Sequence, residues 1–292
     1  MKLVSYVYAG EVSVGVIGAD PEKLVSVQSL GYGARTMPEL IRELGGTIPE
    51  GLPDLVDAAE GISLSEVKLL APIKYPEQDV ICLGCNYVEH RREVDEQLQV
   101  NVDMQQTDTI YFGKRVTEAV DPYGKINSHF DLVDSLDYEA ELAAIIGKDA
   151  YKVNREEVRD YVLGYTILND VSARNLQSKH QQWYFGKSLD GFTPMGPWIV
   201  TADELGWKPE LEIRSYLNGA LRQSANTNMM MKQIDDVLVE LTQGITLRAG
   251  TIIALGTPSG VGAAQEPPQF MKHGDVIRCE IEGIGILENT VD

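Results

Sequence analysis

Long apolar runs are absent from this sequence, and so is an apolar leader segment. No apolar stretch approaches the ~18 residues that a membrane-spanning helix needs. Residues 1–8 contain one lysine and a short apolar run, without the longer apolar region and cleavage site of a secretory signal peptide. We therefore expect a cytoplasmic protein that does not act at a membrane.

Positive charge is scarce in the chain. The 292 residues include 25 lysines and arginines against 44 aspartates and glutamates, so the formal net charge is −19 at pH 7. Nucleic acid and anionic membrane surfaces would repel such a protein, and neither is an expected partner. The charge itself is explained by solubility. An anionic substrate would need a local positive site, such as a metal ion with a few basic side chains.

Cysteine is also rare, because Cys82, Cys85 and Cys279 are the only three in the chain. Cys82 and Cys85 have the C-x-x-C spacing of redox and zinc sites. A zinc site needs further ligands, and the one remaining cysteine is far away in sequence. Cys82 lies in the apolar run 80–83, which favours a buried small hydrophobic side chain. Three cysteines cannot all pair, and a reducing cytoplasmic setting fits them.

The chain is long enough for one large domain or for a large and a small one. Residues 1–72 predict a small N-terminal domain, with a hairpin from residues 3–8 and 12–17 and a helix over 37–44. They carry no chemical motif, so we interpret them as a packing or assembly element. Residues 73–292 contain every candidate site residue and form the predicted catalytic domain.

Strands dominate the pattern beyond residue 73. Short apolar runs bounded by turn residues predict strands, and few segments have helical spacing. The expected strands cover residues 80–83, 110–114, 137–146, 165–170, 192–200, 211–217, 251–255, 275–281 and 285–291, and the expected helices begin near residues 88, 154 and 173 and cover 228–241.

Two glutamates lie on one face of the expected strand that begins at Asp137. Side chains of a strand alternate between its faces, so Glu139 and Glu141 point the same way, with Cα atoms roughly 6.5–7 Å apart. Apolar and small residues continue the strand as far as Gly147. Two carboxylates on a mostly buried strand repel each other and lose water, so they must protonate, find cations or bind a metal.

Asp170 adds a third carboxylate at the end of the next expected strand. A strand–helix–strand unit can pair its two strands and bring Asp170 beside Glu139 and Glu141. Three carboxylates without histidine or cysteine nearby suit a hard cation, Mg²⁺, Mn²⁺ or Ca²⁺, rather than Zn²⁺. The alternative is a solvated edge strand, which explains most Glu-x-Glu pairs. The surrounding apolar run and Asp170 leave the two explanations evenly balanced.

His90 and Glu93 lie three residues apart in a charged segment with helical character. Positions three apart share a helix face, so the two side chains can hydrogen-bond. Glu93 would then orient the imidazole and raise its basicity. A solvated helix face is the alternative, and the spacing alone favours it.

Four motifs taken together resemble the fumarylacetoacetate hydrolase family in their order and spacing. The resemblance covers about residues 73–292. It implies an α+β fold, a strand-dominated mixed β-sandwich roll preceded by a small N-terminal α/β domain, and usually a homodimer. The motifs are Gly84-Cys85-Asn86-Tyr87 with His90 and Glu93, Asp170-Val171-Ser172-Ala173-Arg174 with Gln177, Gly186-Lys187-Ser188, and Gly256-Thr257-Pro258-Ser259-Gly260.

The resemblance assigns a role to each matching residue. His90 and Glu93 correspond to the family's acid/base pair, which reverses the preference for a solvated face. Lys187 corresponds to an active-site lysine that binds a substrate carboxylate or a developing oxyanion. Gln177 and Thr257 correspond to positions that contact the substrate.

One further stretch and three further residues bear on the site. The polar stretch 95–108 fits a mobile lid of the kind that often carries the acid/base pair in this family. Cys85 stands where many relatives carry arginine or another long residue. Lys114 is either a partner for the carboxylates or a surface lysine, and Arg174 can pair a buried carboxylate.

The implied activity is a Mg²⁺-dependent hydrolase that cleaves a C–C bond in a small 2,4-diketo acid of the acylpyruvate or fumarylpyruvate type. Glu139, Glu141 and Asp170 would hold the cation, with Mn²⁺ or Ca²⁺ as alternatives, and the cation would stabilise an enolate. The same site could serve an isomerase or decarboxylase of 2-oxo diacids. A catalytically silent cation-binding protein is the alternative from another class, and it would leave Lys187 and His90 unexplained.

Overall fold

The structure is a computed structural model that describes residues 1–98, 108–180 and 182–292. Within these residues eleven strands form one sheet in the order β4-β3-β2-β1-β13-β11-β10-β16-β6-β7, with β5 beside β1. Most neighbours are antiparallel, and β16 runs parallel to β6. The strands are β1 (Lys2–Tyr8), β2 (Glu11–Ile17), β3 (Lys23–Ser26), β4 (Ile62–Ser63), β5 (Lys68–Leu70), β6 (Val80–Gly84), β7 (Ile110–Lys114), β10 (Ala140–Ile146), β11 (Val162–Asn169), β13 (Met195–Thr201) and β16 (Ile252–Ala254).

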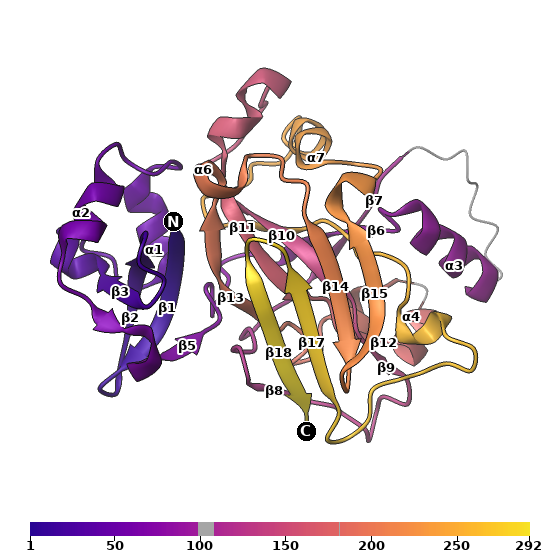
Figure 1. Ribbon diagram of the computed structural model, residues 1–292. Helices are drawn as coiled ribbons and strands as arrows, with labels where there is room; N and C mark the ends of the chain where they lie inside the picture. Colours follow the sequence, from indigo (N-terminus) through magenta and orange to yellow (C-terminus); the bar gives the residue numbers. More distant parts are fainter. Residues whose placement is uncertain (99–107, 181) are drawn as a thin grey trace.

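A second sheet packs over the middle of the first, in front of β10 and β11 in Figure 1. Its order in the described chain is β15-β14-β17-β18-β8, and β9 pairs with β12 separately. The five strands are β8 (Lys125–Ile126), β14 (Glu212–Leu217), β15 (Ala220–Asn226), β17 (Val276–Ile281) and β18 (Gly285–Val291), and the separate pair is β9 (Leu136–Asp137) with β12 (Ser172–Ala173).

The helices are short and lie around the sheets. Among the described residues no helix is long and apolar enough to cross a membrane. The two packed sheets, with short helices around them, confirm the predicted α+β, strand-dominated mixed sandwich. The helices are α1 (Met37–Leu44), α2 (Leu52–Ala58), α3 (Val88–Leu98), α4 (Arg174–His180), α5 (Tyr184–Lys187), α6 (Ala202–Leu205) and α7 (Ile234–Leu241), with 3₁₀ turns η1 (Val27–Leu30), η2 (Leu64–Glu66), η3 (Arg155–Asp160), η4 (Thr227–Met229) and η5 (Gly262–Ala264).

Strand β10 lies at the centre of the fold and is buried at every residue. Leu142 and Ala144 pack with apolar side chains of the second sheet, such as Ile277. Ala143 and Ile145 belong to the core on the opposite face, which β10 shares with the N-terminal strands. A strand covered on both faces needs apolar residues on both, which explains why its sequence does not alternate.

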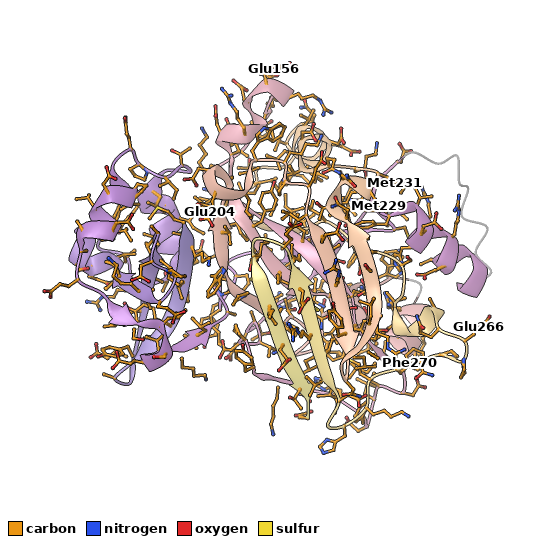
Figure 2. The ribbon with its side chains drawn as sticks, in the orientation of Figure 1. Glu156, Glu204, Met229, Met231, Glu266 and Phe270 are labelled. Carbon is orange, nitrogen blue, oxygen red and sulfur yellow. The ribbon has the colours of Figure 1, made fainter. Side chains whose placement is uncertain are left out.

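The N-terminal region joins the large sheet directly. The predicted hairpin is confirmed, because β1 and β2 pair along their whole length. Strand β1 also pairs with β13, with Leu3 opposite Ile199. The amino group of Met1 donates to Thr201 Oγ1 at 2.8 Å and contacts Glu204, labelled beside β13 and α6 in Figure 2. The domain boundary at residue 72 stays a prediction.

The helix predicted over residues 228–241 is wrong in its first half, because α7 begins at Ile234. Asn86 binds the preceding segment instead: its side chain accepts from Lys232 N and donates to Lys232 O, each at 2.8 Å. Met230 has an extended backbone and residues 231–232 form a bend, so the helix does not extend back to residue 228. Met229 and Met231 are exposed, as Figure 2 shows, while Met230 is buried.

Candidate active site

The strand–helix–strand unit brings the three predicted carboxylates together. Strands β10 and β11 pair antiparallel, with Ala140 opposite Asn169. Glu139 immediately precedes β10 and its carbonyl accepts from Asp170 N at 2.8 Å. One carboxylate oxygen from each of Glu139, Glu141 and Asp170 lies within 4.8 Å of the other two.

Burial of this cluster excludes a solvated edge strand. Glu139 is 5% exposed, Glu141 1% and Asp170 0%. Burial, and then the nearby carboxylates of Asp170 and Glu139, raises the pKa of Glu141 well above its ordinary value of 4.5. The cluster therefore strongly favours an added positive charge.

Two buried lysines supply part of that charge. Lys187 Nζ lies 2.7 Å from Glu139 Oε2 and 2.7 Å from Asp170 Oδ2. Lys114, whose role the sequence left open, is fully buried and its Nζ lies 2.7 Å from Asp170 Oδ1. Lys114 also donates to Val171 O at 3.1 Å and to the carbonyl of Lys187. The two lysines thus fix Asp170 from both sides.

Arg174 completes the positive side of the cluster. Its Nη1 lies 2.7 Å from Glu139 Oε1. Burial opposes ionisation of Glu139, but Lys187 and Arg174 outweigh it and lower the pKa of Glu139 to about 2. Burial likewise opposes the charge on Lys187, but Asp170 and Glu139 outweigh it and raise the pKa of Lys187. These groups are therefore charged at neutral pH.

Glu141 differs from the other two carboxylates in its partners. It accepts a hydrogen bond from Gly256 N at 2.8 Å. Within the described chain no lysine, arginine or histidine nitrogen forms an ion pair with it. An incompletely neutralised group of buried oxygen donors fits a hard divalent cation such as Mg²⁺, Mn²⁺ or Ca²⁺. The residues present therefore suit the predicted metal, and Glu139, Glu141 and Asp170 would hold it.

His90 and Glu93 form the predicted pair on α3. His90 Nδ1 lies 3.2 Å from Glu93 Oε2. The other oxygen of Glu93 accepts from Gly260 N at 2.9 Å, so the carboxylate is tied to the loop before η5. His90 itself is buried. The lid predicted over residues 95–108 lies largely outside the described residues.

A cavity of about 370 Å³ lies beside the carboxylate cluster and the His–Glu pair. Its polar lining includes His90, Glu139, Arg174, Gln177, Lys187 and Thr257. Gln177 Oε1 accepts from Arg174 Nη1 at 3.0 Å, and Thr257 Oγ1 donates to Ala140 O at 2.9 Å. Of the predicted site residues, Glu93, Glu141 and Asp170 lie behind this lining and contact or adjoin the residues that form it.

Asp137 is a site residue that the sequence did not single out. Its Oδ2 lies 2.8 Å from Arg174 Nε and accepts from Ala263 N at 3.0 Å. Its Oδ1 accepts from Gly262 N at 2.7 Å and from Tyr138 N at 2.9 Å. Asp137 therefore fixes Arg174 to the loop that also holds Glu93. A charged residue at the start of a buried strand was the available signal.

The cysteines form no disulfide in the described residues, and all three are buried. Cys82 belongs to the apolar core, as predicted. Cys85 lines the cavity with a left-handed backbone, at φ 55°. Burial, and then Glu139, raises the pKa of the Cys85 thiol to about 11, so the thiol is neutral at physiological pH.

The structure thus places a buried carboxylate cluster and a His–Glu pair at one cavity of a mixed β-sandwich. Residues 79–292 match the family described as fumarylacetoacetate (FAA) hydrolase, C-terminal. The chain therefore belongs to the fumarylacetoacetate hydrolase family.

Three relatives illustrate the range of that family. Oxaloacetate tautomerase YisK of Bacillus subtilis is 42% identical over 230 residues, which are 78% of this chain and 74% of that protein. A fumarylacetoacetate hydrolase from Exiguobacterium antarcticum has a TM-score of 0.84 at 37% identity, covering 100% of this chain and 99% of that one. Maleylpyruvate hydrolase from Sphingobium sp. SYK-6, solved with manganese(II) and pyruvate, has a TM-score of 0.76 at 28% identity, covering 100% and 98%.

Proposed function

We propose that this protein is a divalent-cation-dependent hydrolase that cleaves a C–C bond in a small 2,4-diketo acid. The observation that carries the proposal is the convergence of Glu139, Glu141 and Asp170, buried, next to a cavity that is also lined by His90 and Lys187. A cytoplasmic homodimer is part of the proposal, and sedimentation of the purified protein would test the dimer.

The carboxylate cluster would bind the cation, with Mg²⁺ as the first candidate and Mn²⁺ or Ca²⁺ as alternatives. When bound, the cation would supply the Lewis acid that stabilises negative charge on the 2-oxo oxygen. Lys187 and Lys114 hold Asp170 in place, and Arg174 holds Glu139. Because these contacts are buried and hold both carboxylates in place, they would preorganise the ligand oxygens.

Substrate binding would use the polar groups that line the cavity. Arg174 Nη2 is buried and has no hydrogen-bond partner among the described residues. Together with Gln177 it offers donors to the substrate carboxylate. Thr257 is bound to the backbone of β10 and would shape the wall next to the substrate. Lys187 would stabilise the negative charge that develops on the leaving part.

The His90–Glu93 pair would move the proton. If His90 donates its Nδ1 hydrogen to Glu93, the Nε2 lone pair is free to take a proton from water. The water oxygen then bonds to the C4 carbonyl carbon and the C3–C4 bond breaks. The electron pair of the broken C3–C4 bond remains on the pyruvate part as an enolate, and this enolate is then protonated at C3. The products are pyruvate and a carboxylic acid.

Isomerisation, keto–enol tautomerisation or decarboxylation of a 2-oxo diacid is the second candidate. The supporting observation is the 42% identity to a protein named for oxaloacetate tautomerisation. The same His90 would move a proton to and from C3 of the enolate, without water attack. Both candidates use one cation site and one acid/base pair.

Turnover of a substrate panel separates the candidates. We would offer acylpyruvates, fumarylpyruvate and oxaloacetate with Mg²⁺ or Mn²⁺, and then with EDTA. Cation-dependent release of pyruvate and a carboxylic acid supports the hydrolase. Carbon dioxide release, or an ultraviolet change without cleavage, supports the second candidate. No cation-dependent reaction with any of these acids would contradict both.

A further inference from the structure

The cavity has an apolar side that the proposed chemistry does not use. Leu83, Val94, Phe112, Trp183 and Val261 line it together with the polar groups. Trp183 and Phe112 pack edge to face, with ring centres 5.1 Å apart and planes at 76°. These side chains have no part in holding a cation or moving a proton.

The apolar side begins at the carboxylate cluster. Lys187 Nζ, which contacts Glu139, lies 5.3 Å from the centre of the Phe112 ring. Phe112 is held on β7, opposite Cys82 of β6, and Trp183 packs against it just before α5. A substrate whose 2-oxo acid end lies at the cluster would therefore extend along Phe112 toward Trp183.

Gly84 makes room for Trp183. A Cβ atom added at Gly84 would lie 2.3 Å from Trp183 Cζ3 and 2.7 Å from its Cη2. Such a distance is far inside van der Waals contact, so any larger residue at the end of β6 would displace the indole. Trp183 can therefore lie over the end of β6 only because residue 84 is glycine.

The basic side chains that line the cavity are largely engaged by carboxylates of the site. Among the described lining residues the basic ones are His90, Arg174 and Lys187. Arg174 and Lys187 already contact Asp137, Glu139 and Asp170. With Glu141 and Lys114 included, this group has four carboxylates and three basic side chains. The carboxylates are those of Asp137, Glu139, Glu141 and Asp170, and the basic side chains are Lys114, Arg174 and Lys187. A bound dication would leave the group with one positive charge in excess.

Outside the lining residues, the buried guanidinium of Arg91 on α3 is close enough to act on the thiol of Cys85, which lines the cavity. The whole chain carries a net charge of −19, which repels a dianion more than a monoanion. A second carboxylate at the far end of the substrate would face the apolar rings of Trp183 and Phe112, and burying it against them is unfavourable.

We propose that this site selects 2-oxo acids whose far end is uncharged and apolar, and that Trp183, packed over Gly84 and against Phe112, is the residue that sets this preference. The proposal deepens the proposed function and rests on it for the position of the 2-oxo acid end. It distinguishes this chain from a relative that is named for a dicarboxylic substrate.

Binding of two acids of equal chain length tests the preference without requiring turnover. We would measure the Kd of 2-oxohexanoate and of 2-oxoadipate by calorimetry, with the full chain and saturating Mn²⁺. These acids differ only in the far end, which is a methyl group or a carboxylate. We expect 2-oxohexanoate to bind at least about tenfold more tightly. Equal binding, or tighter binding of 2-oxoadipate, overturns the proposal.

Variants assign the preference to Trp183. Trp183→Ala should weaken binding of 2-oxohexanoate about tenfold and change binding of 2-oxoadipate little. The ratio of the two Kd values should therefore approach one. Trp183→Phe keeps an aromatic wall and should retain part of the ratio. Trp207→Ala, in the loop before β14, is the matched control and should leave both Kd values unchanged. A ratio that survives Trp183→Ala in folded protein overturns the role of Trp183.

The two proposals fail in different ways. If 2-oxohexanoate binds preferentially and no diketo acid is cleaved, the hydrolase assignment is wrong and the apolar site stands. If diketo acids are cleaved but the acids with charged and with apolar far ends have equal Kd values, the hydrolase assignment stands and the apolar selection is wrong. If neither 2-oxo acid binds with Mn²⁺ present, the apolar selection is overturned, and so is the placement of a 2-oxo acid at this site.

Discussion

The N-terminal region and the rest of the chain bury very different side chains. In residues 1–72 the one buried polar side chain is Ser5, and the core consists of residues such as Leu3, Leu40 and Val56. Residues 73–292 bury a dense group of charges on and beside the large sheet. Its members include Lys114, Asp137, Glu139, Glu141, Asp170 and Lys187.

The difference shows which contacts the fold needs and which the chemistry needs. Each buried ion loses hydration that costs several kcal/mol, and ion pairing recovers it only with good geometry. Apolar burial has no such cost and contributes about 1.5–3 kcal/mol for each large side chain. The N-terminal region is therefore expected to respond to mutation through stability, and the carboxylate cluster through activity.

Glu141→Gln should have the largest effect on activity. The variant keeps the shape of the side chain but removes one cation ligand. Several kcal/mol of Lewis-acid stabilisation would be lost, so we expect turnover to fall by roughly 10³-fold or more. The steady-state rate with saturating Mg²⁺ measures this, and circular dichroism checks the fold.

Glu11→Gln is the matched control for that experiment. Glu11 lies on β2 in the N-terminal region and is exposed. Its substitution should leave both the rate and the melting temperature unchanged. Full activity of Glu141→Gln would show that the cluster serves no catalytic role, and the contrast between the two regions would be lost.

Asp137→Asn should have the next largest effect. The amide cannot neutralise Arg174, and it accepts fewer hydrogen bonds from Gly262 N and Ala263 N. Arg174 and the loop that binds Glu93 would shift together. By comparison with residues that orient metal ligands, we expect kcat/KM to fall about 10- to 100-fold.

Asp149→Asn is a close control, because Asp149 makes the same kind of contacts at the surface. It accepts from Ala249 N at 2.9 Å and pairs with Arg248 at 3.1 Å, yet its side chain is 53% exposed. Surface pairs of this kind contribute about 0–1 kcal/mol, so activity should not change. Similar losses in both variants would mean that Asp137 acts through general stability alone.

Leu40→Ala tests the other side of the comparison. Leu40 lies on α1 and is 1% exposed in the N-terminal core. Its truncation should lower the free energy of unfolding by about 2–5 kcal/mol, measured by urea titration. We expect kcat at low temperature to remain unchanged. Leu55→Ala on α2, at an exposed position, should change neither quantity.

The carboxylate cluster could be located from the sequence because its spacing is local. The separation of Glu139 from Glu141 fixes their common face, and pairing of the next strand brings Asp170 to them. The roles of Lys114 and Asp137 could not be derived in this way. Apart from Tyr138, their partners lie 37 to 126 residues away in sequence, so nothing in their own segment shows that they are buried.

Local competition explains the errors in secondary structure. Ile234, Val237, Leu238 and Leu241 have helical spacing and lie on α7, whereas the segment before them is held by Asn86, which binds the backbone of Lys232. The apolar side of the cavity could not be predicted from the sequence either. Gly84 and Trp183, which pack together there, belong to segments that have no common sequence pattern. Such contacts depend on the packed fold and cannot be obtained from periodicity.

The pH dependence of stability in the cation-free protein should show the smallest effect, and it bears on Glu141 directly. Its pKa is raised above the ordinary value of 4.5, so its contribution to stability is complete below pH 4.5 and is lost as the pH rises through the folded-state pKa. Glu139 has the opposite behaviour: its pKa is lowered to about 2, and its contribution is lost as the pH falls from 4.5 toward 2.

In EDTA, the melting temperature of Glu141→Gln should therefore increasingly exceed that of the wild type as the pH rises from 5 to 8. Both proteins retain Glu139, so its titration cancels in the difference. Saturating Mg²⁺ should reverse the order, because the wild type gains cation binding that the variant lacks. A difference that is independent of pH and of Mg²⁺ would mean that Glu141 is already neutralised within the fold, and the cluster would then resemble the uncharged N-terminal core.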